Sequence, residues 1–434
     1  MRGGLSVILA TAGAGGTIAA VRSLGASGVD VEVISSERLA AAAWSRYTKR
    51  TYSAPPESNA EQFLKRLLAI GESSPGRILL PTSDATAWIY AENALLLERY
   101  FRLYHPPIAT LRRILDKKLF EEAAHSVGLS VLPSWDPSSL EELTALAPNL
   151  SFPILIKPRT HVHRVRNDKG VVVDSPHELI RQYHGFVDRE QEGAADTPLL
   201  PDARRPILQQ FVRVKGEGVL SITGFIDRTG ELFVTRAAKK VFQRSQPVGV
   251  GVCFEAQPSP EELPDLVRRL CRELDYFGLF EVEFLHFEDH WAVIDFNPRM
   301  FSQVGMDIRR GMPLPLLACL DAAGDSTSLH REVAKAQAGD DGQAVFRDRF
   351  TLRAILLAQV LTGRMSNVEL SQWRGWMKRH ADHAVDFAAD RDDPMPGVVH
   401  GLSEVYLGLK SLPRFMRARP RTTSSALRVF KQRT

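Results

Sequence analysis

The chain has 434 residues, of which 44% are hydrophobic and 24% are charged, as is usual for a globular protein of two to four domains. It holds 55 Lys and Arg against 51 Asp and Glu, but the segment 410–434 alone contains eight basic residues and no acid. The rest of the chain is therefore mildly acidic, with 47 basic and 51 acidic side chains, and gives no reason to expect nucleic acid as a partner.

The cysteines and the apolar runs bear on where the protein resides. Cys253, Cys271 and Cys319 are scattered, odd in number and without metal spacing, which favours buried thiols in a reducing compartment. No apolar run approaches the ~18 residues of a membrane helix. Residues 1–16 resemble a signal peptide, but their pattern continues directly into a strand–turn–helix unit. We therefore expect a cytoplasmic protein.

Residues 1–108 carry the pattern of a doubly wound α/β domain with a parallel sheet. An apolar run at 5–11 is followed by a Gly-rich turn, a helical pattern and a second strand at 29–35. The turn does not spell the dinucleotide-binding fingerprint, although Glu37 lies at a suitable distance for a ribose contact. A turn of this kind more often lets a helix pack closely on its strand.

A third strand, predicted at 77–81, ends just before Asp84. Open α/β sheets bind their ligands at the carboxyl ends of the strands, so Asp84 lies in the region where a ligand would be expected. Taken alone, Asp84 is more simply interpreted as a helix cap, a role that Thr82 or Ser83 could also take.

Residues 109–159 change to a helix and a short buried strand. Apolar spacing predicts one helix starting at 109, which Gly128 ends. The apolar strand at 152–159 carries Lys157, and a lysine in such a strand usually has an anionic partner. Lys157 is therefore a candidate for binding phosphate, the alternative being a lysine that snorkels from an edge strand.

Two loops interrupt this part of the chain. The segment 160–169 is rich in His, Arg and Lys, which suits a loop over polyphosphate but also an exposed hairpin loop. The segment 187–206 is polar and aperiodic, and we expect it to be a surface insertion.

A run of strands follows and ends in a hairpin. We expect strands at 206–212, 216–227, 231–242 and 248–256, a helix at 262–278, and a hairpin at 279–299 with FEDH at its turn. The polar stretch 327–344 is expected to be a linker. Residues 345–434 look mainly helical and carry no motif to which we can assign chemistry.

The hairpin places two acids and an amide where they can meet. Asp295 and Asn297 are two residues apart on the second strand, so their side chains share one face. Antiparallel pairing across the turn can bring Glu283 beside Asp295 on that face. Two opposed carboxylates repel each other unless a cation or a proton lies between them. Because Mg²⁺ prefers oxygen donors of this kind, the three residues predict a site for one or two Mg²⁺ ions.

These residues resemble the metal-binding signature of the ATP-grasp superfamily, an acid on one strand followed by acid–x–Asn on the next. Further motifs occur in the family's order: DKKLFEEAAHSVGLSVLPS, Lys157 in ILIKPR, QQFVRVKGEG at the hinge, and the KK of RAAKKVF. The resemblance covers roughly residues 5–320. It implies an ATP-grasp fold of two α+β subdomains at 109–326, with a lid subdomain at about 135–212, followed by a mainly helical C-terminal extension at 345–434.

What the resemblance implies about activity is an ADP-forming carboxylate–amine ligase, similar to D-aspartate and dipeptide ligases. Phosphoryl transfer from ATP converts a carboxylate into an acyl phosphate, which an amine then attacks. The implied cofactors are ATP and one or two Mg²⁺ ions, with Mn²⁺ as an alternative. Two other interpretations stay open: a carboxylase-like enzyme that activates bicarbonate, and an ATP-binding regulatory module without turnover.

The resemblance also implies roles for individual residues. Lys157 and Arg299 would be catalytic, Arg299 by holding the substrate carboxylate and the acyl phosphate. The residues expected to hold Mg²⁺ are Glu283, Asp295 and Asn297. The residues expected to contact ATP are Lys118, Lys157, Gln210, Val212, Glu217 and Lys240, with Lys239 as the register alternative to Lys240.

The sequence departs from the family's pattern in two places. The loop after Lys157 lacks the usual Gly and Ser run, so His161, His163 and Arg164 are the speculative ligands there. Asp295 stands where glutamate is more common, which keeps the charge on a side chain shorter by one methylene.

The C-terminal segment and the partners are separate expectations. The interleaved apolar and basic residues of 411–434 suit weak contact with an anionic membrane surface, although a solvated tail is the simpler interpretation. Family resemblance alone favours a homodimer. The other partners we expect are a small-molecule carboxylate and amine.

Overall fold

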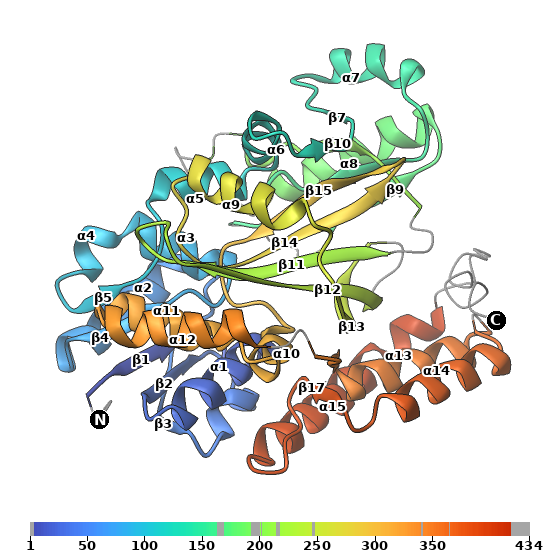
Figure 1. The fold of residues 1–434 in the computed structure, drawn as a ribbon. Coiled ribbons are helices and arrows are strands. Elements are labelled where there is room, and N and C mark those ends of the chain that lie inside the picture. Colours follow the sequence, from blue (N-terminus) through green and yellow to red (C-terminus); the bar gives the residue numbers. More distant parts are fainter. Residues whose placement is uncertain are drawn as a thin grey trace.

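The computed structural model describes residues 4–162, 169–191, 200, 202–213, 218–244, 248–339, 342–363 and 365–417 (Figure 1). Within these residues the strands form three sheets, of five, four and eight strands. The expectation of a mixed α/β fold that opens with a parallel sheet is confirmed. The division into domains at 1–108, 109–326 and 345–434 stays a prediction.

The first sheet has the order β3-β2-β1-β4-β5, and all its neighbouring strands run parallel. Its central strands are buried on both faces, as the continuous apolar runs in the sequence predict. The strands are β1 Ser6–Leu9, β2 Asp30–Ser35, β3 Thr48–Ser53, β4 Arg77–Leu80 and β5 Phe101–Leu103. The helical segments around them are α1 Gly15–Ala26, η1 Ala41–Trp44, α2 Ala60–Ser73, α3 Asp84–Glu92 and α4 Ala94–Leu97.

The Gly-rich turn serves close packing between this sheet and the C-terminal half of the chain. A Cβ atom on Gly16 would lie 2.6 Å from the carbonyl oxygen of Phe301, and one on Gly15 would lie 2.5 Å from the ring of Phe387. Larger residues would push α1 away from these neighbours. The turn thus serves close packing, as expected, but the neighbours are Phe301 and Phe387 and not the preceding strand.

The helix predicted from residue 109 is two helices, α5 Ile108–Leu115 and α6 Lys117–Ser126. Asp116 separates them in an extended conformation, and its carboxylate accepts hydrogen bonds from the backbone N–H groups of Lys118 and Leu119. The single-helix prediction was wrong because apolar spacing continues across Asp116, whereas the capping preference of aspartate interrupts the backbone.

The second sheet is antiparallel, with the order β7-β10-β8-β9. The expected surface insertion at 187–206 is helical at its start, because α8 continues to Gln191, while residues 192–199 lie outside the described part of the chain. The elements here are β7 Ser134–Trp135, α7 Leu140–Leu146, η2 Ala147–Asn149, β8 Ile154–Lys157, β9 Val171–Val173, α8 Pro176–Gln191 and β10 Ile207–Gln210.

The third sheet has the order β17-β16-β13-β12-β11-β14-β15-β6. One face packs on α5, α6 and α9, and the other on α10, α11 and α12. Its strands are β6 Ser130–Val131, β11 Val219–Ile226, β12 Phe233–Arg244, β13 Val250–Gln257, β14 Gly278–Phe287, β15 His290–Asn297, β16 Val345–Arg347 and β17 Ala384–Asp386. The covering helices include α9 Leu263–Glu273, α10 Val304–Arg309, α11 Leu314–Ala323 and α12 Ser326–Ala338.

The linker expected at 327–344 was wrong for most of its length, since α12 spans Ser326–Ala338. Leu329, Val333 and Ala336 lie on its buried face at helical spacing, and Asp325 caps its first turn. This helix has only one narrow apolar stripe among many polar residues, so composition alone suggested a loop.

The C-terminal region is mainly helical in its described part, as expected, with α13 Arg349–Leu361, α14 Asn367–Arg379 and α15 Met395–Arg417. It also supplies β16 and β17, which extend the third sheet beyond β13. Asp393, just before α15, accepts hydrogen bonds from the side chains of Arg22 and Ser45 in the N-terminal domain. The segment just before α15 is thus tied to α1 and to the residue that follows η1. No helix in the described ranges is long and apolar enough to cross a membrane.

A buried ion pair should make the docking of α15 depend on pH. The Nε2 atom of His400 lies 3.1 Å from Oδ1 of Asp348, the residue that caps α13, and the His400 ring stacks on Phe387. Burial alone would lower the pKa of His400, but the hydrogen bond and charge of Asp348 outweigh it and raise the pKa above its usual value. The pair therefore stabilises the fold fully below about pH 6.5 and loses this contribution as the pH rises through the raised pKa.

We expect His400→Gln to lower the free energy of unfolding more at acidic than at alkaline pH, with a difference of about 1 kcal/mol. Urea denaturation of the wild type and the variant at about pH 6 and about pH 8.5, followed by tryptophan fluorescence, measures this. Equal losses at the two pH values would show that His400 acts only through packing.

Candidate active site

The β14–β15 hairpin pairs Glu283 directly with Asp295, and Glu281 with Asn297. The pairing predicted for the two acids is thus confirmed. The alternation of the two strands explains the arrangement, because Val282 and Phe296 enter the apolar cluster on the opposite face. An irregularity between Glu283 and Phe284 leaves Ile294 out of the paired register. One face of the hairpin therefore carries three acids and an amide side by side.

Two lysines from other elements neutralise the paired carboxylates. Lys240 of β12 forms an ion pair with Glu283, and Lys117 at the start of α6 forms one with Asp295. Burial alone would raise the pKa of Asp295, but the positive charges of Lys117, Lys169 and Lys157 outweigh burial and hold that pKa far below its usual range. Burial alone would lower the pKa of Lys240, whereas the charge and hydrogen bond of Glu283 raise it. Each acid of the pair thus has a lysine as its partner, and the surrounding lysines favour the ionised form of Asp295.

Lys157 connects the second sheet with the third. Its Nζ atom donates to the carbonyl oxygen of Ile294, at 3.1 Å, and to Oε1 of Gln209, at 3.4 Å. The Ile294 carbonyl can accept this bond because the hairpin irregularity removes Ile294 from the ladder. Burial, together with the nearby charge of Lys117, lowers the pKa of Lys157 to about 8. The ammonium of Lys157, which comes from β8 of the second sheet, therefore lies beside the strand that carries Asp295. An anion bound at the hairpin would be within its reach.

The residue that reaches the hairpin from α6 is Lys117, whereas the sequence pointed to Lys118. Lys117 is buried, and its ammonium lies on Asp295, while Lys118 is half-buried. The difference follows from Asp116, whose capping conformation sets which of the two lysines turns inward. The assignment of Lys118 to ATP stays a prediction, and Lys117 is the residue that sequence reasoning missed.

The structure describes only some of the residues that were predicted to contact ATP at the hinge and near its phosphates. Gln210 ends β10, and its side-chain amide donates to the Pro153 carbonyl, so any adenine contact must come from its backbone. Val212 is half-buried just beyond that strand. Glu217 lies outside the described residues, as do His163 and Arg164. Lys240 rather than its register alternative Lys239 contacts Glu283, and His161 lies 3.4 Å from the ammonium of Lys169.

Arg299 joins the hairpin to the N-terminal domain. Its Nε atom donates to Oδ1 of Asp84, at 3.0 Å, and its Nη2 atom donates to Oδ1 of Asn297, at 2.7 Å. The helix cap at this position is Ser83, which forms a capping box with Thr86, so the simple interpretation of Asp84 as the cap was wrong. Asp84, the first residue of α3, instead holds the guanidinium from the carboxyl end of β4. The position predicted for a ligand contact thus adjoins the acidic hairpin.

Glu281 is a buried acid that sequence reasoning did not single out. It accepts hydrogen bonds from Oγ of Ser221 and Nδ2 of Asn297, both at 3.0 Å, and from the amide of Gln303. Burial and the neighbouring charge of Glu283 raise its pKa. By taking the amide nitrogen of Asn297, Glu281 fixes which way the Asn297 oxygen points. The spacing of Glu281 and Glu283 on one strand face was the signal that could have revealed it.

The donor set is one that Mg²⁺ would accept. Glu283, Asp295 and Asn297 supply two carboxylates and an amide oxygen on one face, and hard divalent cations prefer oxygen ligands completed by water or phosphate. Within the described chain no three His, Cys, Asp or Glu residues are grouped closely enough to hold a metal ion by themselves. Further ligands would therefore come from water or from a bound anion, and the lysines around the hairpin favour an anion that carries phosphate.

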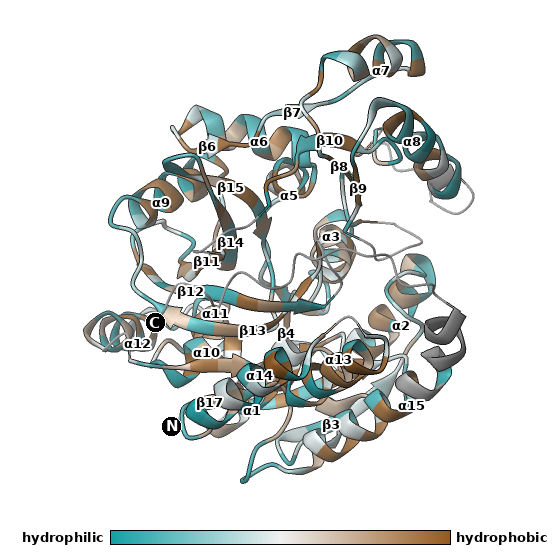
Figure 2. Ribbon diagram, turned by 90° about the vertical axis from the view of Figure 1, so that its right-hand side faces the viewer, coloured by the Kyte–Doolittle hydropathy of each residue, from teal (hydrophilic) through white to brown (hydrophobic). Residues whose placement is uncertain are grey.

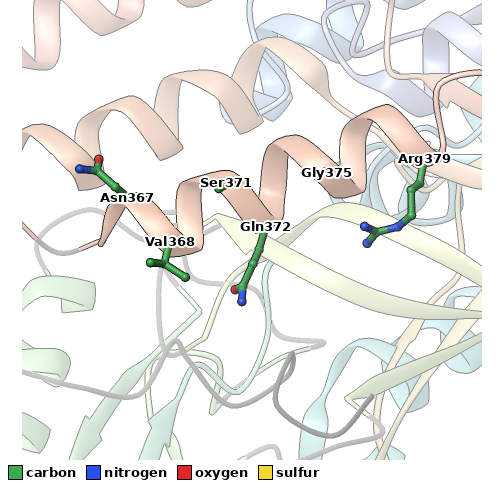
Figure 3. Close-up of a pocket in the computed structure, with 6 residues that line it drawn as sticks. All are labelled: Asn367, Val368, Ser371, Gln372, Gly375 and Arg379. Atoms are coloured by element: carbon green, nitrogen blue, oxygen red, sulfur yellow. The ribbon is translucent and has the colours of Figure 1, made fainter. Parts of the chain in front are cut away.

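A separate groove follows one helix of the C-terminal region (Figure 3). All its lining residues belong to α14, and none belongs to the hairpin or to the elements that contact it. They are Asn367, Val368, Ser371, Gln372, Gly375 and Arg379. This groove brings no reactive groups together, so the hairpin is the candidate active site.

The ion pair of Lys117 should contribute to the free energy of unfolding, whereas the side chain of Lys118 should contribute little. Lys117→Met leaves the Asp295 carboxylate, only 14% exposed, without its ammonium and should lower the free energy of unfolding by about 3 kcal/mol. The matched variant Lys118→Met should cost less than about 1 kcal/mol. Urea denaturation in the presence of a chelator measures both, and equal losses would contradict the assignment of Lys117.

Comparison with known sequences gives a partial match. No model of a protein family matches the chain. The arginine-specific carbamoyl phosphate synthase large chain of Halalkalibacterium halodurans is 23% identical over 211 residues, which make up 46% of this chain and 18% of that protein. The match thus spans less than a fifth of that relative's length.

Comparison with solved structures covers 74% of the chain. Biotin carboxylase from Campylobacter jejuni, complexed with β-γ-ATP, has a TM-score of 0.57 at 14% identity, with 71% of its chain covered. The biotin carboxylase domain of Hydrogenobacter thermophilus 2-oxoglutarate carboxylase, complexed with MgADP, ADP and bicarbonate, has a TM-score of 0.58 at 17% identity, with 69% covered.

A third neighbour has the same level of similarity. N5-carboxyaminoimidazole synthetase from Staphylococcus aureus has a TM-score of 0.56 at 14% identity, with 78% of its chain covered. These neighbours are ATP-grasp proteins, and so is the carbamoyl phosphate synthase relative. The resemblance found in the sequence is thus confirmed at the level of the fold: the chain has the fold of the ATP-grasp proteins.

Proposed function

We propose that the chain is an ATP-dependent ligase that activates a carboxylate as an acyl phosphate, forms ADP, and joins the acyl group to an amine. The observation that carries the proposal is the direct pairing of Glu283 with Asp295 within reach of Lys117, Lys157 and Lys240. Two paired carboxyl groups among three converging lysines suit a polyphosphate that arrives with divalent cations. ATP-grasp neighbours solved with ATP or ADP ligands support the nucleotide.

Each group of residues would have its own role in phosphoryl transfer. Mg²⁺, one or two ions with Mn²⁺ as a substitute, would be held by Glu283, Asp295 and Asn297 and would neutralise charge on the phosphates. Lys157 and Lys240 would fix phosphate oxygens as point charges, with Lys117 beside them and Lys118 retained from the sequence assignment. Adenine and ribose would lie at the hinge, against the backbone of Gln210 and Val212 and the carboxylate of Glu217.

The proposed reaction needs no reactant other than ATP, the carboxylate and the amine. A carboxylate oxygen of the substrate attacks the γ-phosphorus of ATP, and the bond to the β–γ bridging oxygen breaks to release ADP. The amine nitrogen then attacks the carbonyl carbon of the acyl phosphate, loses a proton, and expels inorganic phosphate. Arg299 would steady the carboxylate and then the acyl phosphate, since a guanidinium matches such oxygen pairs in geometry and charge.

Asp84 would act on the amine. Its carboxylate lies on Arg299, at the carboxyl end of β4, so an amine bound there would adjoin the activated carboxyl group. A carboxylate in this position can accept hydrogen bonds from an ammonium and take up the proton that the nitrogen loses. Since Asp84 belongs to the N-terminal domain, that domain would supply the acceptor side of the reaction.

Bicarbonate is the second candidate for the carboxylate. The Hydrogenobacter thermophilus neighbour was solved with bicarbonate, and another neighbour is named as a carboxyaminoimidazole synthetase. A fold shared at this level of identity leaves the substrate of this chain open, so bicarbonate belongs among the carboxylates tested. We place the reaction in the cytoplasm, where ATP is supplied and the three buried thiols stay reduced, and retain a homodimer as the expected assembly.

ADP release by the purified chain with Mg·ATP tests the proposal. D- and L-amino acids, simple carboxylic acids and bicarbonate would each be supplied with and without amines. We expect release that requires both a carboxylate and an amine, and that falls about a hundredfold or more in Glu283→Gln. The matched variant Asp289→Ala, in the exposed turn of the same hairpin, should keep full activity.

Three outcomes would count against the proposal. AMP in place of ADP would exclude an acyl phosphate. Release supported by bicarbonate alone among the carboxylates would select the carboxylase-like alternative. Tight binding of Mg·ATP without release for any pair of substrates would select the regulatory module.

Asp84→Asn should separate the two half-reactions. We expect the KM for the amine to rise and kcat/KM for the amine to fall by about a hundredfold, because the acceptor for the ammonium proton is lost. ADP formed slowly without amine should change little. Glu92→Gln, at the other, exposed end of α3, is the matched control. If both half-reactions fall together, Asp84 serves only to position Arg299.

A further inference from the structure

The last described helix exposes a row of apolar side chains. Met395, Val398, Leu402, Val405 and Tyr406 of α15 are each between 42% and 63% exposed. Their spacing of three and four residues places them along one side of the helix. We call this row the α15 stripe. A helix of a globular protein normally turns such a row inward, so its exposure requires an explanation.

The opposite side of α15 is already packed against the protein. His400 lies on Asp348 and stacks on Phe387, and Gly401 lies against the ring of Phe350. The N-terminal side of the molecule contacts the helix through η1. Figure 2 shows α15 at the edge of the molecule with hydrophobic segments along it. Because these contacts fix its rotation, α15 cannot bury the stripe by turning.

The sequence that follows the α15 stripe is strongly basic. From Lys410 to the end of the chain there are eight Lys or Arg and no acid, and the only acid within α15 is Glu404. Residues 418–434 lie beyond the described part of the chain, and six of the eight basic residues lie at 417 or later. An apolar helix face that continues into a basic segment is the pattern of a helix lying in the plane of an anionic membrane surface.

We propose that α15 docks the protein on a bilayer that contains anionic lipids. The stripe enters the boundary between headgroups and acyl chains, while the basic residues from Lys410 onward contact the anionic headgroups. On α13, which packs beside α15, Leu357 and Leu361 are also exposed, at 59% and 74%. The surface uses no residue of the candidate active site, so its failure and that of the ligase proposal are distinguishable.

A second copy of the chain explains these observations less well. Pairing of two stripes about a twofold axis would give the assembly two segments of eight basic residues, and neither contains an acid to face the other. An apolar contact between copies would also have no use for the basic run. A bilayer with anionic headgroups satisfies both the apolar and the charged features.

Vesicle sedimentation of the full chain tests the proposal. Vesicles of phosphatidylcholine alone would be compared with vesicles that also contain phosphatidylglycerol. We expect at least about tenfold tighter binding to the anionic vesicles, weakened by added salt. Leu402→Glu combined with Val405→Glu should weaken this binding about tenfold or more. Leu95→Glu combined with Leu96→Glu, on the equally exposed surface of α4, should leave it unchanged.

The remaining outcomes overturn the proposal. Equal binding of the wild type and the stripe variant to anionic vesicles would show that charge alone acts. Equal binding to both vesicle types, or to neither, would remove the role of anionic lipid. A wild-type dimer in sedimentation velocity that the stripe variant converts to a monomer would assign the stripe to a second copy. Thermal unfolding of each variant checks that the substitutions leave the fold intact.

Discussion

The site depends on the pairing of two carboxylates across a hairpin. Glu283 and Asp295 lie in direct register, and two carboxylates so placed would repel each other unless cations accompanied them. The protein supplies those cations from other parts of the chain, Lys240 from β12 and Lys117 from α6. The four side chains of these pairs are each at most 15% exposed, so removing either member of a pair would leave a poorly solvated charge without its partner. The repulsion between the two acids thus requires a lysine from β12 and a lysine from α6 to lie against the hairpin.

The same constraint extends through Arg299 to the N-terminal domain. Glu281 takes the amide nitrogen of Asn297, which leaves the Asn297 oxygen to accept from Arg299, and Arg299 in turn lies on Asp84. This chain of hydrogen bonds begins on β14 and ends at the first turn of α3. Gly16 allows α1 to approach the loop that follows Arg299, so the backbone packing supports the same junction. The acidic hairpin and the carboxyl end of β4 are thus held together by side chains from both.

The sequence predicted the structure where the relevant residues lie close together along the chain. The turn length and strand alternation of the hairpin predicted the pairing of Glu283 with Asp295. The single charge in an apolar strand drew attention to Lys157, whose ammonium lies on the Ile294 carbonyl of that hairpin. Prediction failed where a local signal was weak or the partner was distant in sequence. Asp116 interrupts a helix whose apolar spacing continues, so the sequence did not reveal that Lys117 reaches Asp295. The strands β16 and β17 have three residues each and pair with partners far away in the chain.

The charge state of Lys157 shows what the site is prepared to receive. Its pKa of about 8 means that burial and the charge of Lys117 oppose its protonation more strongly than the nearby acids favour it. The ammonium therefore bears an electrostatic cost in the free protein, which only additional negative charge can remove. A polyphosphate beside Lys157 and Lys117 would supply that charge, raise the pKa again and stabilise both ammonium groups. Under the proposed function, the unfavourable proximity of the two lysines would contribute to the binding of an anion, and the hairpin acids would contribute to the binding of a divalent cation.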